Sequence, residues 1–109
     1  MKNVPQHFNR LQRQFPTFVE ALERLGETVK SIGPLDARTC HLIQLAAAAT
    51  NRSEGAVHSH ARRAIEAGAT MDEIHHALLC LTSTIGFPAV SAALSWVDDS
   101  LGVRGADRD

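Results

Sequence analysis

The sequence contains no tyrosine and few runs of β-branched residues, the residue types that are enriched in β-strands. It has no apolar run approaching the ~20 residues that a transmembrane helix needs. No apolar segment follows the first charged residues, as it would in a signal peptide. These absences argue against a β-rich fold, a membrane protein and a secreted protein. We therefore expect a helical protein of the cytoplasm with no membrane partner.

The chain also has little net charge, at −1 over 109 residues. No basic stripe is long enough to follow a phosphate backbone, so we expect no nucleic-acid partner. Apolar residues make up 44% and charged residues 21%, as in ordinary globular proteins. The length predicts a single domain over 1–109 that leaves enough apolar surface exposed for self-association.

Cysteine is scarce, with only Cys40 and Cys80, which lie far apart and form no CxxC motif. In a reducing compartment such residues are expected to be free, buried thiols.

Helical periodicity, by contrast, runs through nearly the whole chain, and we predict an all-α fold of five or six helices. Pro16 divides the segment from about 5 to 30 into two helices. The second of these has an apolar face, and Gly33-Pro34 ends it. Further helices are expected over about 36–51, 53–67, 70–85 and 89–99, followed by a loose polar tail over 102–109. The apolar face of the second helix comprises Phe18, Leu22, Leu25 and Val29.

Start and stop signals delimit these helices. Ser53 is the expected N-cap of the helix over 53–67, and Gly68 is its expected stop. Thr70 and Glu73 form the pattern of a capping box. The segment 42–49 is apolar nearly all round, so we expect its helix to be buried on several sides.

Five of the six histidines lie on the helices predicted between residues 36 and 85. His60 lies on the flank of the apolar face of its helix, whereas His58 is rotated from it by about 200° and points elsewhere. His41 lies on the alanine-rich helix and needs a polar partner, for which His60 is a candidate. For His60, a structural role at the edge of the core is the alternative to an acid–base role. For His75 and His76, a polar helix face is the preferred interpretation.

From Leu35-Asp36 through the last helix, the chain resembles the carboxymuconolactone decarboxylase family, which includes the alkylhydroperoxidase D-like proteins. The family pattern is C-x-x-C-x-x-x-H-x-x-x-A-x-x-x-G followed by E-I-x-x-x-L, and a preceding helix of the form E-L-I-x-L-A resembles segment 41–46. The resemblance implies an alkylhydroperoxidase D-like bundle with its core over about 35–101, assembled as a trimer or hexamer. The residues at matching spacings are His60, Ala64, Gly68, Glu73, Ile74 and Leu78.

The chain departs from this pattern at the reactive positions. The two motif cysteines correspond to Ser53 and Ala56, and the family glutamate corresponds to His41. The peroxidase members are thought to use the cysteine pair as a dithiol, and serine and alanine cannot replace a thiolate and a resolving thiol. The resemblance therefore favours decarboxylase- or lyase-like chemistry over peroxidase chemistry.

Three hypotheses follow. The first is an enzyme acting on a small organic molecule without a cofactor, in which His60 is the general acid/base and His41 its partner. Glu54 and His58 would lie near the pocket mouth or a subunit contact, and Arg62 offers carboxylate binding. The second is a non-catalytic protein that binds a ligand or a divalent metal, Zn²⁺ or Ni²⁺, through His41, His58 and His60 across a subunit boundary. The third is a peroxidase using Cys40 or Cys80.

Overall fold

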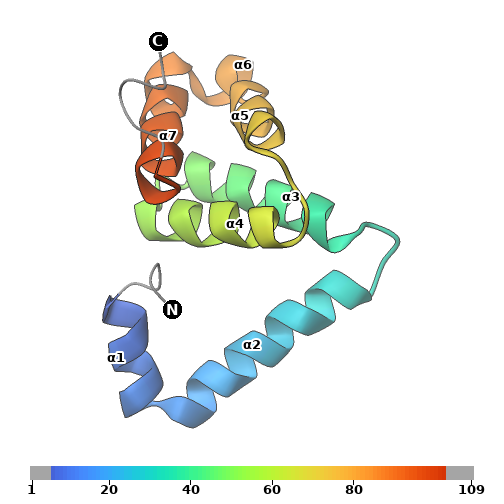
Figure 1. The fold of residues 1–109 in the computed structure, drawn as a ribbon, viewed down its shortest axis with the longest axis vertical. Helices are drawn as coiled ribbons and strands as arrows, with labels where there is room; N and C mark the ends of the chain where they lie inside the picture. The colour runs from blue at the N-terminus through green and yellow to red at the C-terminus, as the bar shows by residue number, and fades with distance from the viewer. Residues whose placement is uncertain (1–5, 103–109) are drawn as a thin grey trace. The chain divides into compact units, whose positions relative to one another are not determined.

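The computed structural model describes residues 6–102, and these form helices and turns only, so the all-α prediction is confirmed. Six of the helices are at least nine residues long and α6 is a single turn, which agrees with the five or six helices expected. The helices are α1 (Gln6–Gln14), α2 (Pro16–Ser31), α3 (Ala37–Thr50), α4 (Glu54–Glu66), α5 (Met71–Leu79), α6 (Thr82–Ile85) and α7 (Phe87–Ser100) (Figure 1). Most of the predicted polar tail lies outside the described residues.

Contacts divide the chain into two compact units, Met1–Ala37 and Arg38–Asp109. In the first unit α1 packs on α2. The residue Pro16 begins α2 as the sequence predicts, because its fixed φ suits a first helical turn and its missing N–H has no partner there anyway. Val19 is the buried residue of α2. Among residues 6–102, no helix is both long and apolar enough to span a bilayer.

The second unit contains the main hydrophobic core. Helices α4 and α7 make its most extensive contact, and α5 packs on both. Alanines dominate the crossing, with Ala61, Ala64 and Ala93 fully buried, so the two helices can approach closely. The largest side chains that fill the remaining space are Leu45, Ile74, Leu78, Val57 and Val97.

Helices α3 and α4 form a hairpin closed by a three-residue connection (Figure 1). Arg52 adopts a left-handed conformation with φ 56°, and its N–H donates to the carbonyl of Ala49. The N–H of Ser53 donates to the carbonyl of Ala48. This pair of hydrogen bonds is a Schellman motif, and it ends α3 by satisfying two of its last carbonyls.

The end of α4 uses the same motif, now with the glycine that the sequence predicts. Gly68 has φ 105°, its N–H donates to the carbonyl of Ile65, and the N–H of Ala69 donates to that of Ala64. Ala64 and Ala69 are both buried, which supplies the hydrophobic contact that accompanies this motif.

Gly68→Ala is expected to destabilise the protein by ~1–2 kcal/mol, because a β-carbon disfavours the left-handed backbone. A β-carbon at Gly68 meets nothing within 4 Å, so the loss reports the backbone alone. Gly55→Ala is the matched control, since Gly55 lies in the first turn of the same helix and its β-carbon also enters open space. Gly55→Ala should instead stabilise the protein by ~0.5–1 kcal/mol, because alanine favours a helix more than glycine does. Urea unfolding of both variants measures the two changes in the free energy of unfolding. Changes of the same sign would contradict the assignment of a left-handed backbone to Gly68 and a helical backbone to Gly55.

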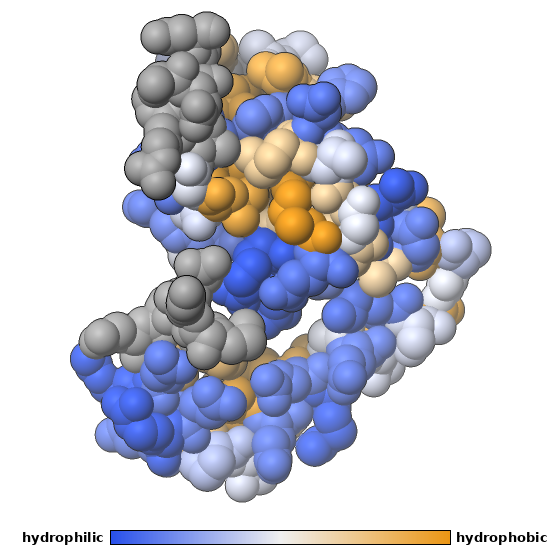
Figure 2. All heavy atoms as spheres, in the orientation of Figure 1, coloured by the Kyte–Doolittle hydropathy of each residue, from blue (hydrophilic) through white to orange (hydrophobic). Residues whose placement is uncertain are grey.

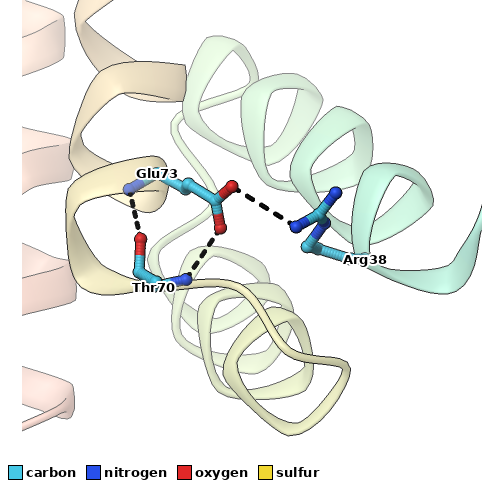
Figure 3. A network of polar contacts seen from close by, with 3 residues as sticks. All are labelled: Arg38, Thr70 and Glu73. Atoms are coloured by element: carbon cyan, nitrogen blue, oxygen red, sulfur yellow. Dashed lines mark hydrogen bonds and ion pairs between the residues drawn. The ribbon is translucent and has the colours of Figure 1, made fainter.

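The start of α5 is fixed by the predicted capping box and by an ion pair to α3 (Figure 3). The N–H of Glu73 donates to the Thr70 hydroxyl at 3.1 Å, and the N–H of Thr70 donates to the Glu73 carboxylate at 2.9 Å. The second carboxylate oxygen of Glu73 accepts from Arg38 at 3.4 Å. One glutamate therefore caps α5 and ties it to the beginning of α3.

Ser53 is the N-cap of α4 as predicted, although its side chain makes no capping hydrogen bond. Two other sequence predictions about these helices were wrong. The segment expected as one helix over 70–85 breaks after Leu79, because the N–H of Leu81 bonds to Leu78 three residues back and the Thr82 hydroxyl donates to the Leu79 carbonyl. Helix α3 buries one face only, and Ile43 lies exposed on another.

Candidate functional site

The centre of the candidate site is a pair of imidazole rings from neighbouring helices. The ring of His41 on α3 and the ring of His60 on α4 have their centroids 5.8 Å apart, with their planes tilted by 37°. The proximity expected from the sequence is therefore observed, whereas a catalytic role for either ring stays a prediction.

The hairpin explains why these two residues meet. Helices joined by so short a connection run antiparallel, and residues at similar distances from the turn lie side by side. His41 lies ten residues before Asn51, and His60 lies eight residues after Arg52. At ~1.5 Å per residue, the difference of two residues offsets the rings by only ~3 Å along the helices.

The two rings differ in their access to solvent. His41 is 4% exposed and is the one buried polar residue of the described core, whereas His60 is half-buried. Of the pair, His60 is the more exposed ring.

His58 and Glu54 form a separate pair. The Nε2 atom of His58 lies 3.6 Å from a carboxylate oxygen of Glu54, one helical turn earlier, and Glu54 is largely exposed. This contact is an i,i+4 pair on the surface of α4, for which the interaction is worth ~0.5 kcal/mol or less. The rotation of about 200° between residues two apart directs His58 away from His60. The sequence-predicted residues thus form two pairs rather than one cluster.

The positions of the family's motif cysteines lie at the start of α4. Ser53 is the exposed N-cap, and Ala56 is half-buried against the core. A hydroxyl and a methyl group stand where a dithiol would act, so this location offers no redox chemistry.

The expectation of two buried thiols was wrong, although both cysteines are free. Cys80 is exposed and Cys40 is half-buried. Cys80 directly follows the last residue of α5 and lies two positions after Leu78, which rotates it by about 200° from the buried side chains of Ile74 and Leu78.

No group of three or more His, Cys, Asp or Glu side chains within residues 6–102 of one chain is arranged to hold a metal ion. The suggested ligands His41, His58 and His60 do not converge in one subunit. A metal site built from them needs residues of a second copy.

The structure also reveals a polar pair between α5 and α7 that the sequence did not predict. The Nε2 atom of His75 on α5 lies 2.8 Å from a carboxylate oxygen of Asp98 on α7, and the Asp98 side chain is 14% exposed. The preferred sequence interpretation of His75 was a polar helix face. The two partners are 23 residues apart in sequence, so no local pattern indicates that they are in contact. Because the pair links α5 to α7, its position fits a structural contact.

Comparison with known proteins agrees with this architecture. The model of the carboxymuconolactone decarboxylase family matches residues 16–99, a match that begins well before the start at about 35 suggested by the sequence. An uncharacterized protein of Haemophilus influenzae is 38% identical over 62 residues, which is 57% of this chain and 55% of that protein. The matched stretch thus spans about half the length of that relative.

A crystal structure of a carboxymuconolactone decarboxylase family protein from Legionella pneumophila has the same fold, with a TM-score of 0.76. The superposition covers 94% of this chain and 91% of the other, at 20% sequence identity. At that identity the similarity establishes the fold alone. It leaves the chemistry of the site to be argued from this chain's own residues.

Proposed function

The chain belongs to the carboxymuconolactone decarboxylase family, and from this premise we propose that it is a small-molecule enzyme whose acid–base site centres on His60. The observation that carries the proposal is the approach of the His41 and His60 rings to 5.8 Å, with one ring buried and the other half-buried. A buried polar ring beside an accessible one is an arrangement that can orient a proton-transfer group.

The chemistry that suits this site is proton transfer to or from carbon. When a carboxylate substrate loses CO₂, the electron pair of the broken C–C bond stays on the substrate carbon. Protonated His60 then delivers its proton to that carbon and becomes neutral imidazole, which recovers a proton from water. Imidazole titrates near neutral pH and is suited to both steps. Arg62 carries a guanidinium group suited to a carboxylate, but it lies two residues after His60 on α4 and is rotated from it by about 200°, so we assign it no part in this step.

Peroxidase chemistry is disfavoured by the cysteine positions. Peroxide reduction by a dithiol needs an attacking thiolate and a second thiol that closes the disulfide. The family's positions for that pair are occupied by Ser53 and Ala56. The existing thiols belong to different helical regions, with Cys40 in α3 and Cys80 after α5.

A ligand- or metal-binding protein without catalysis is the second candidate. It is favoured by the density of imidazoles on α3 and α4, where His41, His58 and His60 lie within 20 residues of one another. Because these rings do not converge within one chain, a Zn²⁺ or Ni²⁺ site would be completed by a second copy.

Turnover assays of three protein samples distinguish these functions. Wild type and the double variant Cys40→Ser/Cys80→Ser are tested with carboxymuconolactone, with a panel of small lactone acids and 3-oxo acids, and separately with hydrogen peroxide. A third sample is wild type treated with a chelator. We expect all three to release CO₂ from one of the acids at equal rates, because neither cysteine nor metal takes part.

Absence of turnover with every acid would contradict the decarboxylase proposal. Peroxide consumption that disappears in the double serine variant would establish the peroxidase alternative. Metal analysis of untagged protein addresses the second candidate, since a tight site must retain metal close to one equivalent per site.

A further inference from the structure

Helix α2 carries an apolar surface that α1, its neighbour in the first unit, leaves uncovered. Six large apolar side chains along it are 42–76% exposed, and we refer to them as the α2 seam. Hydrophobic side chains are visible at the surface of the α1–α2 unit beside the hydrophilic ones (Figure 2). The seam consists of Phe15, Phe18, Leu22, Leu25, Val29 and Ile32.

The spacing of the seam is that of a coiled coil. Its steps alternate regularly between three and four residues from Phe15 to Ile32, which places the residues at successive a and d positions of a heptad. The charged side chains of α2 all fall at the b, c and f positions of this heptad, away from the seam. They are Glu20, Glu23, Arg24, Glu27 and Lys30.

The seam is also symmetric about its own midpoint, which lies between residues 23 and 24. Reversing the helix about this point superimposes Phe15 on Ile32, Phe18 on Val29 and Leu22 on Leu25. Each phenylalanine thereby faces a smaller β-branched residue, so the combined volume of each layer stays similar along the seam. A symmetric seam of this kind is complementary to itself in an antiparallel arrangement.

We propose that α2 packs antiparallel against α2 of a second copy of this chain, with the two-fold axis between Leu22 and Leu25. The contact goes beyond the proposed enzymatic function and does not depend on it.

The flanks of the seam favour another protein helix over a lipid surface. The e and g positions beside it are Val19, Ala21, Gly26 and Thr28, which are uncharged and mostly small. A β-carbon at Gly26 would meet nothing within 4 Å in the single chain, so a second helix has room to approach. The opposite face of α2 has three glutamates against one arginine and one lysine, whereas helices that lie on membranes are rich in basic residues.

The size of the seam is sufficient for a specific contact. Six side chains exposed to this degree present on the order of 500 Å² of surface, the upper end of what single chains leave uncovered. Two seams together bury roughly 1,000 Å², the lower bound for a biological interface. The first unit has 37 residues, a size at which association commonly supplies stability that the internal core does not.

Sedimentation equilibrium of the full-length protein tests this contact. Wild type is expected to have a mass of twice the chain or an even multiple of it, and Leu25→Glu is expected to halve that mass. Leu79→Glu is the matched control, because Leu79 is 49% exposed on α5 and lies outside the seam. The control should retain the wild-type mass, and both variants should keep the far-ultraviolet circular dichroism of a folded helical protein.

Disulfide trapping tests the antiparallel orientation in a background of Cys40→Ser and Cys80→Ser. In the proposed pairing Phe18 faces Val29 of the other copy, whereas the two copies of Phe18 are ~16 Å apart along the axis. A mixture of Phe18→Cys chains and Val29→Cys chains should therefore form a disulfide-linked dimer on oxidation. Neither variant alone should do so.

Three results would overturn the proposal. A monomeric wild type would show that the seam is covered within the chain or remains free, and binding of that monomer to anionic vesicles would indicate a membrane contact. An unchanged mass for Leu25→Glu would place the subunit contact elsewhere. Cross-linking of Phe18→Cys chains with one another would show a parallel pair.

Discussion

His60→Gln is expected to lower kcat/KM on the substrate identified in the turnover assays by ~10² to 10⁴-fold, the range typical of losing a general acid or base. Glutamine retains hydrogen-bonding groups of similar size but cannot exchange a proton near neutral pH. Because His60 is half-buried in the middle of α4, the substitution leaves no large cavity. The loss should fall mainly on kcat, since a proton is transferred in the chemical step.

His76→Gln is the matched control, because His76 is an exposed histidine in the last turn of α5. It should retain wild-type kcat and KM. If His60→Gln retains wild-type kcat/KM, the proposed site is refuted. The fraction of folded His60→Gln is measured by thermal unfolding. If the activity of this variant falls only as much as its folded fraction, His60 has a structural role.

The pH dependence of the reaction gives an independent measure of the same pair. Two imidazoles 5.8 Å apart are close enough for a proton on one ring to make a proton on the other more costly. The wild-type rate profile should therefore show the macroscopic titration of a coupled pair. His41→Phe removes the second charge, so the profile should simplify to a single titration. An identical profile in wild type and His41→Phe would contradict coupling between the rings.

Leu78→Ala is expected to destabilise the protein by ~2–5 kcal/mol, the largest change in stability predicted for a single substitution in this chain. Leu78 is fully buried on α5 and belongs to the cluster that joins α3, α4, α5 and α7. Truncating it removes apolar contacts and leaves a cavity that its packed neighbours can fill only partly. Urea unfolding monitored by circular dichroism measures the loss through the midpoint at constant m-value.

Leu79→Ala is the corresponding control, since Leu79 follows Leu78 in the same helix and is 49% exposed. It should change the free energy of unfolding by less than ~0.5 kcal/mol. Equal losses at the two positions would mean that the face of α5 has been assigned incorrectly.

The sequence was sufficient to predict features that depend on neighbours along the chain. Pro16 at the start of α2, Gly68 after α4 and the Thr70–Glu73 capping box each act within a few residues, and all three are observed. The proximity of His41 and His60 could also be predicted, because a short hairpin fixes which residues of two successive helices lie opposite each other.

Features set by distant contacts could not be predicted in the same way. The His75–Asp98 pair joins helices that are separated in sequence by α6, and neither residue shows a local preference for the other. The end of α5 at Leu79 could not be predicted either, because Leu81 and Ile85 continue the apolar spacing of Ile74 and Leu78 past the break. For Ser53, residue type predicted the capping position but not the side-chain hydrogen bond.

The left-handed Arg52 between α3 and α4 makes the spacing of the histidine pair sensitive to loop length. An insertion of one residue in this turn would advance α4 by one position, rotating every later side chain by ~100° and shifting it by ~1.5 Å relative to α3. His60 would then leave His41, and the side chains that α4 presents to α3 in the shared core would change with it. The length of this turn therefore fixes the rotation of α4 relative to α3. Insertions and deletions that loops elsewhere tolerate would here disrupt the site and the core together.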